Sequence, residues 1–388
     1  MSYHRCYDSG MNLNQLSVAG PYTHDNLSMY LLLGSDSFDG NRFIPLDDAL
    51  EQKCVVVHET GNVGELEVEN LSELFDLYIQ AGDVVKGGRQ DRTLGVDFVL
   101  PAKSGRVPIP SFCVESGRWH RRATEEAGSF SSSKSYLSSK KLRMAAKLSK
   151  SQGEVWQKVA ETQEDLSESL DKPLYAAASP TSYQLTVEDE DLQKRKETYR
   201  TAFAKILDDQ PRAVGYAFVI NGEINTADAY GSGVLFRKLW SKLLDAAVLE
   251  AIGELRRKAE APPAPVSSEV IQQWFIEAEK TGISGRQEVP PRVRVDIRSN
   301  SSSASSPSCC SRSCSAAAAR WCASSIKIRN TAAVPSSSRC RKRRATRNEP
   351  RSDHPCGAGE TRRHRGRRSA FGNLGRHPSR HPRRTTGG

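Results

Sequence analysis

Residues 82–119 hold most of the side chains that could do chemistry. The run GDVVKGGRQDR sets charged side chains beside two adjacent glycines, and the run CVESGRW follows after a strand-like stretch. A glycine-rich turn can present backbone N–H groups, and neighbouring cations can bind a phosphate or a carboxylate. The candidate ligand-binding residues of the first run are Lys86, Arg89, Gln90, Asp91 and Arg92. The alternative is an ordinary β-hairpin whose glycines supply positive φ and whose charges are solvated.

The first run is not a nucleotide-hydrolysis loop. It begins with the spacing of a Walker A motif, but its glycines are followed by Arg89 and Gln90, without the Lys and Ser or Thr that would bind phosphate and magnesium. No helix pattern follows it directly. No HExxH, CxxC or paired-carboxylate pattern occurs elsewhere, so we expect no metal and no cofactor.

The second run offers a cysteine, a carboxylate and an arginine close together. A phosphatase loop needs five residues between Cys and Arg, whereas four separate Cys113 from Arg118. Strand alternation puts Cys113 and Glu115 on the same side, but a cysteine in a half-buried strand usually packs without reacting. We expect Arg118 and Trp119 to anchor the strand end or to line a groove, through stacking and bidentate pairing with an anion.

A third candidate lies in the run AVGYAFVINGEINTADAY. The dipeptide Asn221-Gly222 predicts a tight hairpin turn between two strands. On the second strand Asp228 and Tyr230 share a face, whereas Asn225 faces the other way. Asp228 is therefore the candidate site residue of this hairpin.

The alternation of apolar and polar residues predicts an α+β fold. Strand-like runs, mostly antiparallel as a sheet or sandwich, fill the N-terminal half, and ELEVEN at residues 65–70 alternates strictly. Pro108 and Pro110 place their strand at an edge or make it start late. The C-terminal half adds helices at 153–166, 189–207 and 235–258 and the hairpin, and residues 129–151 form a loop leading into a helix. We expect a flexible arm at 1–24, one domain at 25–298 and a disordered tail at 299–388.

Composition separates the tail from the rest of the chain. From residue 299 there are 20 Lys and Arg against 3 Asp and Glu, which leaves 36 against 43 in residues 1–298. The basic sequence pI of 9.1 thus comes from the tail, which would bind nucleic acid non-specifically. No run of about 18 apolar residues suggests a membrane span, and the first residues lack the apolar core of a signal peptide. We expect a cytoplasmic protein with no membrane contact.

The tail also predicts a change of reading frame. Its cations are 18 Arg and 2 Lys, and it has almost no Leu, Ile, Val or Phe. If the serines of residues 305–310 use TCN codons, reading one base earlier gives mostly apolar residues, as a buried strand would need. The alternative is a genuine disordered basic tail. The nucleotide sequence across codons 295–310 tests this prediction; AGY serine codons or an early stop in the alternative frame would contradict it.

Three separated motifs resemble one bacterial family. They are GDVVKGGRQDRTL, CVESGRW followed by a Ser-rich basic loop, and GYAFVINGEINTADAYGSGVLFRKLWSKLL. Together they resemble the domain family named for its association with ADP-ribosylglycohydrolases and rhodanese-phosphatases, over about residues 15–298. The resemblance implies genomic company with NAD or ADP-ribose metabolism and supplies no established catalytic residues. The family pattern ends in a further strand and helix that the tail lacks, which also favours the frameshift.

The candidate residues lead to two functional hypotheses. The first is a non-enzymatic binding module that recognises a nucleotide-like or phosphorylated ligand, or a protein partner, through the GGRQDR turn and Arg118-Trp119. The second is an enzyme acting on an ADP-ribose-type or phosphorylated substrate, with Asp91, Glu115 or Asp228 as acid or base. A single cleft shared by these residues would favour the enzyme. The Ser- and Lys-rich segment 129–150 is a further candidate for docking a partner.

Overall fold

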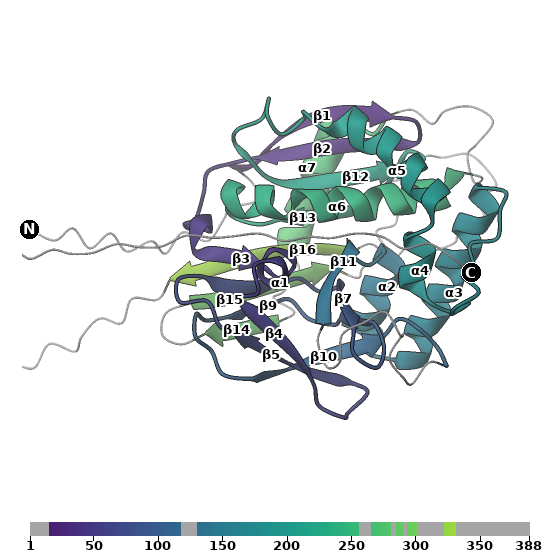
Figure 1. Cartoon of the computed structure of the whole chain (residues 1–388). Helices are drawn as coiled ribbons and strands as arrows, with labels where there is room; N and C mark the ends of the chain where they lie inside the picture. Colours follow the sequence, from purple (N-terminus) through teal and green to yellow (C-terminus); the bar gives the residue numbers. More distant parts are fainter. Residues whose placement is uncertain are drawn as a thin grey trace, which may run out of the picture. The chain divides into compact units, whose positions relative to one another are not determined.

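The computed structural model describes residues 15–117, 130–255, 265–280, 285–289, 293–300 and 322–330. The chain divides into two units, Met1–Val334 and Pro335–Gly388, and all described residues belong to the first. This unit contains three β-sheets with helices packed around them (Figure 1). The predicted α+β class, with mostly antiparallel sheet in the N-terminal half, is confirmed.

The largest sheet joins strands from both ends of the described chain. Its order is β1-β2-β12-β13-β16-β15-β14, and every pair is antiparallel except β13 with β16, which is parallel. The strands are β1 Ser17–His24, β2 Leu27–Leu33, β12 Ala213–Ile220, β13 Glu223–Ala229, β14 Gly285–Val289, β15 Val293–Asn300 and β16 Cys322–Asn330. The predicted hairpin is β12–β13, and Asn221 and Gly222 both have positive φ, 51° and 80°, as a primed turn requires.

Helices cover both faces of this sheet. On one face Met29 and Leu31 of β2 belong to the same buried cluster as most of helix α6, Gly233–Gly253. On the other face Tyr30 and Leu32 pack with Ile271 of helix α7, Ser268–Lys280. Successive residues of a strand point to opposite faces, so one apolar strand serves two separate cores.

Two smaller sheets carry the glycine turn and the predicted edge strand. The six-stranded sheet has the order β11-β7-β8-β10-β5-β4, and β3-β6-β9 forms the third sheet. Their strands are β3 Phe43–Pro45, β4 Val55–Glu59, β5 Glu65–Asn70, β6 Asp76–Ile79, β7 Asp83–Gly87, β8 Arg92–Leu94, β9 Phe98–Leu100, β10 Val107–Cys113 and β11 Phe130–Leu137. The alternation of β5 is confirmed, with Leu66 and Val68 fully buried. Pro108 and Pro110 lie in the half of β10 that pairs with β5, whereas residues 111–113 pair with β8.

Further helices and two short helical turns complete the described part of the fold. They are α1 Leu46–Glu51, α2 Lys140–Met144, the π-helical turn η3 Ala145–Ser149, α3 Gln152–Ser169, α4 Tyr183–Val187 and α5 Glu190–Phe203, with a short 3-10 turn η2 at Gly40–Arg42. Helices α3 and α5 both pack against α6. None of the helices within the described residues is long and apolar enough to cross a membrane.

Three sequence-based boundaries need correction. Residues 17–24 were expected in a flexible arm but form β1, because they pair with β2 in antiparallel register. Residues 130–137 were expected in a loop but form β11, which pairs with β7. The domain does not stop at residue 298, since β15 runs to Asn300 and residues 322–330 form β16. The other residues beyond Asn300 lie outside the described part, and the frameshift stays a prediction.

Candidate functional site

The glycine turn between β7 and β8 binds two carboxylates of the protein itself. The backbone N–H of Arg89 donates to Glu59 Oε1 at 2.9 Å, and that of Gly87 donates to Asp91 Oδ1 at 3.0 Å. Gly88 has φ 58°, and a Cβ there would lie 2.5 Å from Glu59 Oε1. The turn thus directs backbone N–H groups at carboxylates, and both of these N–H groups are already hydrogen-bonded within the protein.

The cations beside the turn are also engaged. Lys86 Nζ lies 2.6 Å from Glu188 Oε1, at the end of helix α4. The Arg92 side chain is 3% exposed; its Nη1 donates to the carbonyl of Val63 at 3.1 Å and its Nη2 lies 3.7 Å from Glu59 Oε2. Of the three cationic side chains predicted in this run, only that of Arg89 is exposed. These contacts favour a structural role for Lys86 and Arg92.

The Cys113 thiol is buried against Arg92. Arg92 Nη1 donates to Cys113 Sγ, and the backbone of Cys113 exchanges two 2.8 Å hydrogen bonds with the side chain of Gln152. Burial raises the pKa of the Cys113 thiol, although the guanidinium beside it opposes the rise. A thiol that stays protonated is a poor nucleophile, which agrees with the packing interpretation.

Gln90, Asp91 and Glu115 lie next to one another without forming an open site. Gln90 Nε2 donates to the carbonyl of Glu115 at 3.3 Å, and the backbone N–H of Val114 donates to the carbonyl of Asp91 at 3.1 Å. The three side chains are fully buried. Arg118 and Trp119 lie outside the described residues.

Asp228 belongs to a different sheet and a different polar cluster. Its Oδ2 accepts a hydrogen bond from the Tyr216 hydroxyl and one from Arg143 Nη2 at 3.4 Å. Burial raises the pKa of Tyr216 well above its ordinary value, so the hydroxyl remains a donor. Asp228 itself is 1% exposed. It therefore holds other side chains and does not face solvent.

Among the described residues, three adjoining cavities lie between α2 and α6, and two of them also border α3. None is lined by a candidate residue of the runs 82–119 or by Asp228, although part of the docking candidate 129–150 lines the largest. The largest, about 400 Å³, is lined by residues of these helices, of η3 and of β13: Lys140, Lys141, Met144, Ala145, Leu148, Ser149, Glu154, Lys158, Asn225, Glu250 and Glu254. Two smaller cavities of about 10 Å³ each adjoin it through shared lining residues. One of these is also lined by Arg143 and Tyr216, the partners of Asp228. Asp228 does not line this small cavity itself, but it accepts hydrogen bonds from two of the side chains that do.

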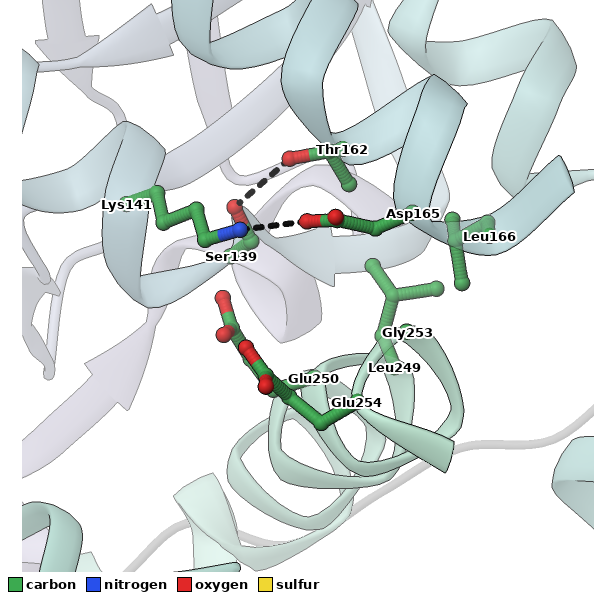
Figure 2. A pocket seen from close by; sticks show the side chains of 9 residues that line it. All are labelled: Ser139, Lys141, Thr162, Asp165, Leu166, Leu249, Glu250, Gly253 and Glu254. Carbon is green, nitrogen blue, oxygen red and sulfur yellow. Dashed lines mark hydrogen bonds and ion pairs between the residues drawn. The ribbon is translucent and has the colours of Figure 1, made fainter. Parts of the chain in front are cut away.

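Side chains of opposite charge line the other small cavity, which does not include Arg143 or Tyr216. Figure 2 shows Lys141 directed at Asp165, with the carboxylates of Glu250 and Glu254 below them. Burial alone would lower the pKa of Lys141, but its hydrogen bond to Asp165 and the charges of Glu250 and Glu254 raise it. Burial raises the pKa of Glu250, against the lowering effect of Lys141 and Lys140. Within the described residues, no group of three His, Cys, Asp or Glu side chains could hold a metal ion.

The sequence does contain a signal for this pocket. Glu250 and Glu254 continue the apolar stripe of α6 that passes through Leu239 and Leu243, since residues three and four apart share a helix face. A carboxylate on an otherwise apolar helix face indicates that a polar site interrupts the hydrophobic core at that position. The second signal is Lys140-Lys141 at the start of α2, whose N-cap is Ser139.

The fold and its pocket define an α+β domain with a polar cavity between helices. A family model, described as the ARG and Rhodanese-Phosphatase-superfamily-associated Protein domain, matches residues 15–313. The chain belongs to this family, and the resemblance noted in the three motifs is confirmed. The match begins just before β1 and extends beyond Asn300, which supports the corrected boundaries. Comparison with curated proteins and with solved structures gives no match.

Proposed function

We propose that the protein is a cytoplasmic binding module for an anionic, nucleotide-like or phosphorylated ligand, and that this ligand occupies the 400 Å³ pocket. The observation that carries the proposal is the set of three lysines, Lys140, Lys141 and Lys158, on the wall of one cavity. Its volume falls in the range of small-molecule sites. The family's association with ADP-ribosylglycohydrolases directs the first choice of ligands to ADP-ribose and NAD.

The pocket is a better place for the ligand than the glycine turn. At that turn an external anion would have to displace Glu59 or Asp91 from the backbone N–H groups. In the pocket Lys158 is held by Glu161 on its own helix, with 2.8 Å between Lys158 Nζ and Glu161 Oε1, and it is partly exposed. An exposed ion pair of this kind contributes little to stability, so a phosphate can replace the carboxylate as its partner.

The pocket lysines provide the test. In calorimetric titrations with ADP-ribose, NAD and pyrophosphate, the Lys140→Ala and Lys158→Ala variants should each bind about tenfold more weakly than the unmodified protein, as the loss of a charged hydrogen bond implies. Lys194→Ala, on the exposed face of α5, is the matched control and should bind normally.

Two outcomes would contradict the placement of the ligand. Absence of binding by every anion tested would remove the binding function itself. Binding that survives both pocket substitutions but is lost in Arg89→Ala would return the ligand to the glycine turn, where the Arg89 side chain is exposed.

The enzyme hypothesis stays a prediction. Asp91 and Glu115 lie in or beside the six-stranded sheet, whereas Asp228 lies on β13 of the seven-stranded sheet. None of the three lines any of the cavities described beside α2 and α6. The binding module is therefore the function that the geometry supports better.

A further inference from the structure

Glu250 occupies the junction of the three cavities. Among the described residues, it alone lines all three of them. The backbone N–H of Lys140 donates to its carboxylate. Its Oε1 atom is shielded from solvent and has no hydrogen-bond partner among the described residues. A buried carboxylate oxygen without a donor is costly, so this atom identifies a position where a ligand donor would be stabilising.

The charges around Glu250 restrict the kind of donor. Lys140 and Lys141 face it from α2, and Lys158 lines the same pocket from α3. The other carboxylates nearby are Asp165, which takes the Lys141 ammonium, Glu254, and Glu154, which lines the largest cavity. A fully anionic group cannot donate to Glu250, whereas the three lysines favour an anionic group elsewhere on the same ligand. A neutral hydroxyl carried by an anionic molecule satisfies both the lysines and the carboxylate.

We propose that the pocket selects a hydroxylated phosphate ester. Its phosphate binds beside Lys140 and Lys158, and one of its hydroxyl groups donates to Glu250 Oε1. Glu250 is then the residue that distinguishes such an ester from a bare phosphate. This inference rests on the proposed anion-binding function and names the ligand class for the same pocket. Figure 2 shows the Glu250 carboxylate directed into the space below Lys141.

The test compares two nucleotides that differ only in hydroxyl groups, together with a bare anion. Adenosine diphosphate, 2′,3′-dideoxyadenosine diphosphate and pyrophosphate are titrated into the full chain and into Glu250→Ala and Glu250→Gln. The unmodified protein should bind adenosine diphosphate about tenfold to a hundredfold more tightly than the dideoxy compound, the range expected for one hydrogen bond to a charged group. Glu250→Ala should abolish this preference, and Glu250→Gln, which keeps a weaker acceptor, should reduce it.

Pyrophosphate makes the two proposals separable. Its binding should be unchanged or tighter in Glu250→Ala, because a negative charge leaves the anion site. If none of the three ligands binds the unmodified protein, the anion-binding function fails. If all three bind but the dideoxy compound binds as tightly as adenosine diphosphate, or Glu250→Ala weakens all three equally, the role of Glu250 is overturned while anion binding stands. Glu164→Ala, at an exposed position of α3 outside the pocket, is the control, and thermal unfolding verifies that each variant is folded.

Discussion

Replacing Lys242 by methionine is expected to lower the free energy of unfolding by about 3–5 kcal/mol near neutral pH, because it removes one partner of a buried ion cluster. The Lys242 side chain is 0% exposed. Its Nζ lies 2.7 Å from Asp83 Oδ1 and 3.1 Å from Asp47 Oδ1. Methionine keeps much of the side-chain volume but leaves two carboxylates without their cation.

The cost of this substitution should depend on pH through Asp83. Burial raises the pKa of Asp83 from 3.8 to about 6, against the lowering effect of Lys242. The folded state therefore binds this proton more tightly than the unfolded state, and the resulting stabilisation, complete below pH 3.8, is lost as the pH rises through about 6. Without Lys242 the pKa rises further. Lys242→Met should then be less destabilising near about pH 5 than near about pH 7.5.

Urea denaturation at these two pH values measures the effect. Lys194→Met is the matched control, since the Lys194 side chain is 73% exposed, and its effect should stay within about 0.5 kcal/mol at both pH values. Asp83→Asn in the Lys242→Met background should remove the difference between the two pH values. An equal loss of stability at both, with Asp83 intact, would contradict the assignment to Asp83.

Removing the Asp228 carboxylate is the second large expected effect. The side chains of Asp228 and Arg143 are 2% and 7% exposed, so Asp228→Ala takes a negative charge away from a buried guanidinium. We expect a loss of about 3–5 kcal/mol in the free energy of unfolding. Tyr216→Phe removes one hydrogen bond to the same carboxylate and should cost about 1.5–3 kcal/mol.

The double variant tests whether these residues act as one cluster. Because Tyr216 and Asp228 are in direct contact, the cost of Asp228→Ala with Tyr216→Phe should be smaller than the sum of the single costs. Chemical denaturation of the four proteins gives this coupling. Asp209→Ala, at an exposed position, should be nearly neutral. Additive costs would mean that the Tyr216–Asp228 bond contributes no coupling to stability.

Features that depend on neighbouring residues could be predicted from the sequence. The alternation of residues 65–70 and the Asn221-Gly222 turn are local patterns, and both have the structure that their residues favour. The strand at 130–137 was missed because its serine-rich sequence carries no alternation. Its place in the sheet comes from pairing with β7, more than forty residues earlier, for which the sequence gives no local signal.

The candidate site shows the same limit. The charged side chains of the glycine turn can be recognised in the sequence. The distant carboxylates that bind the turn and its lysine cannot. Glu59 lies 30 positions before Arg89, and Glu188 lies 102 positions after Lys86. The pocket likewise joins residues of α2, α3 and α6 that only tertiary packing brings together. The sequence therefore identifies side chains that could bind a ligand, but it does not identify the distant residues that already bind them and limit their accessibility.

The position of β16 has a consequence for how the chain is completed during synthesis. Within the large sheet, the β14–β15 hairpin is connected to β13 through β16 alone. A nascent chain that has reached residue 300 can already pair β1, β2, β12 and β13, but its last hairpin has no strand to join. The sheet closes only after residues 322–330 leave the ribosome and insert between two strands that were made earlier. A change of amino acid in this short segment would thus alter the middle of a sheet and not merely a terminus.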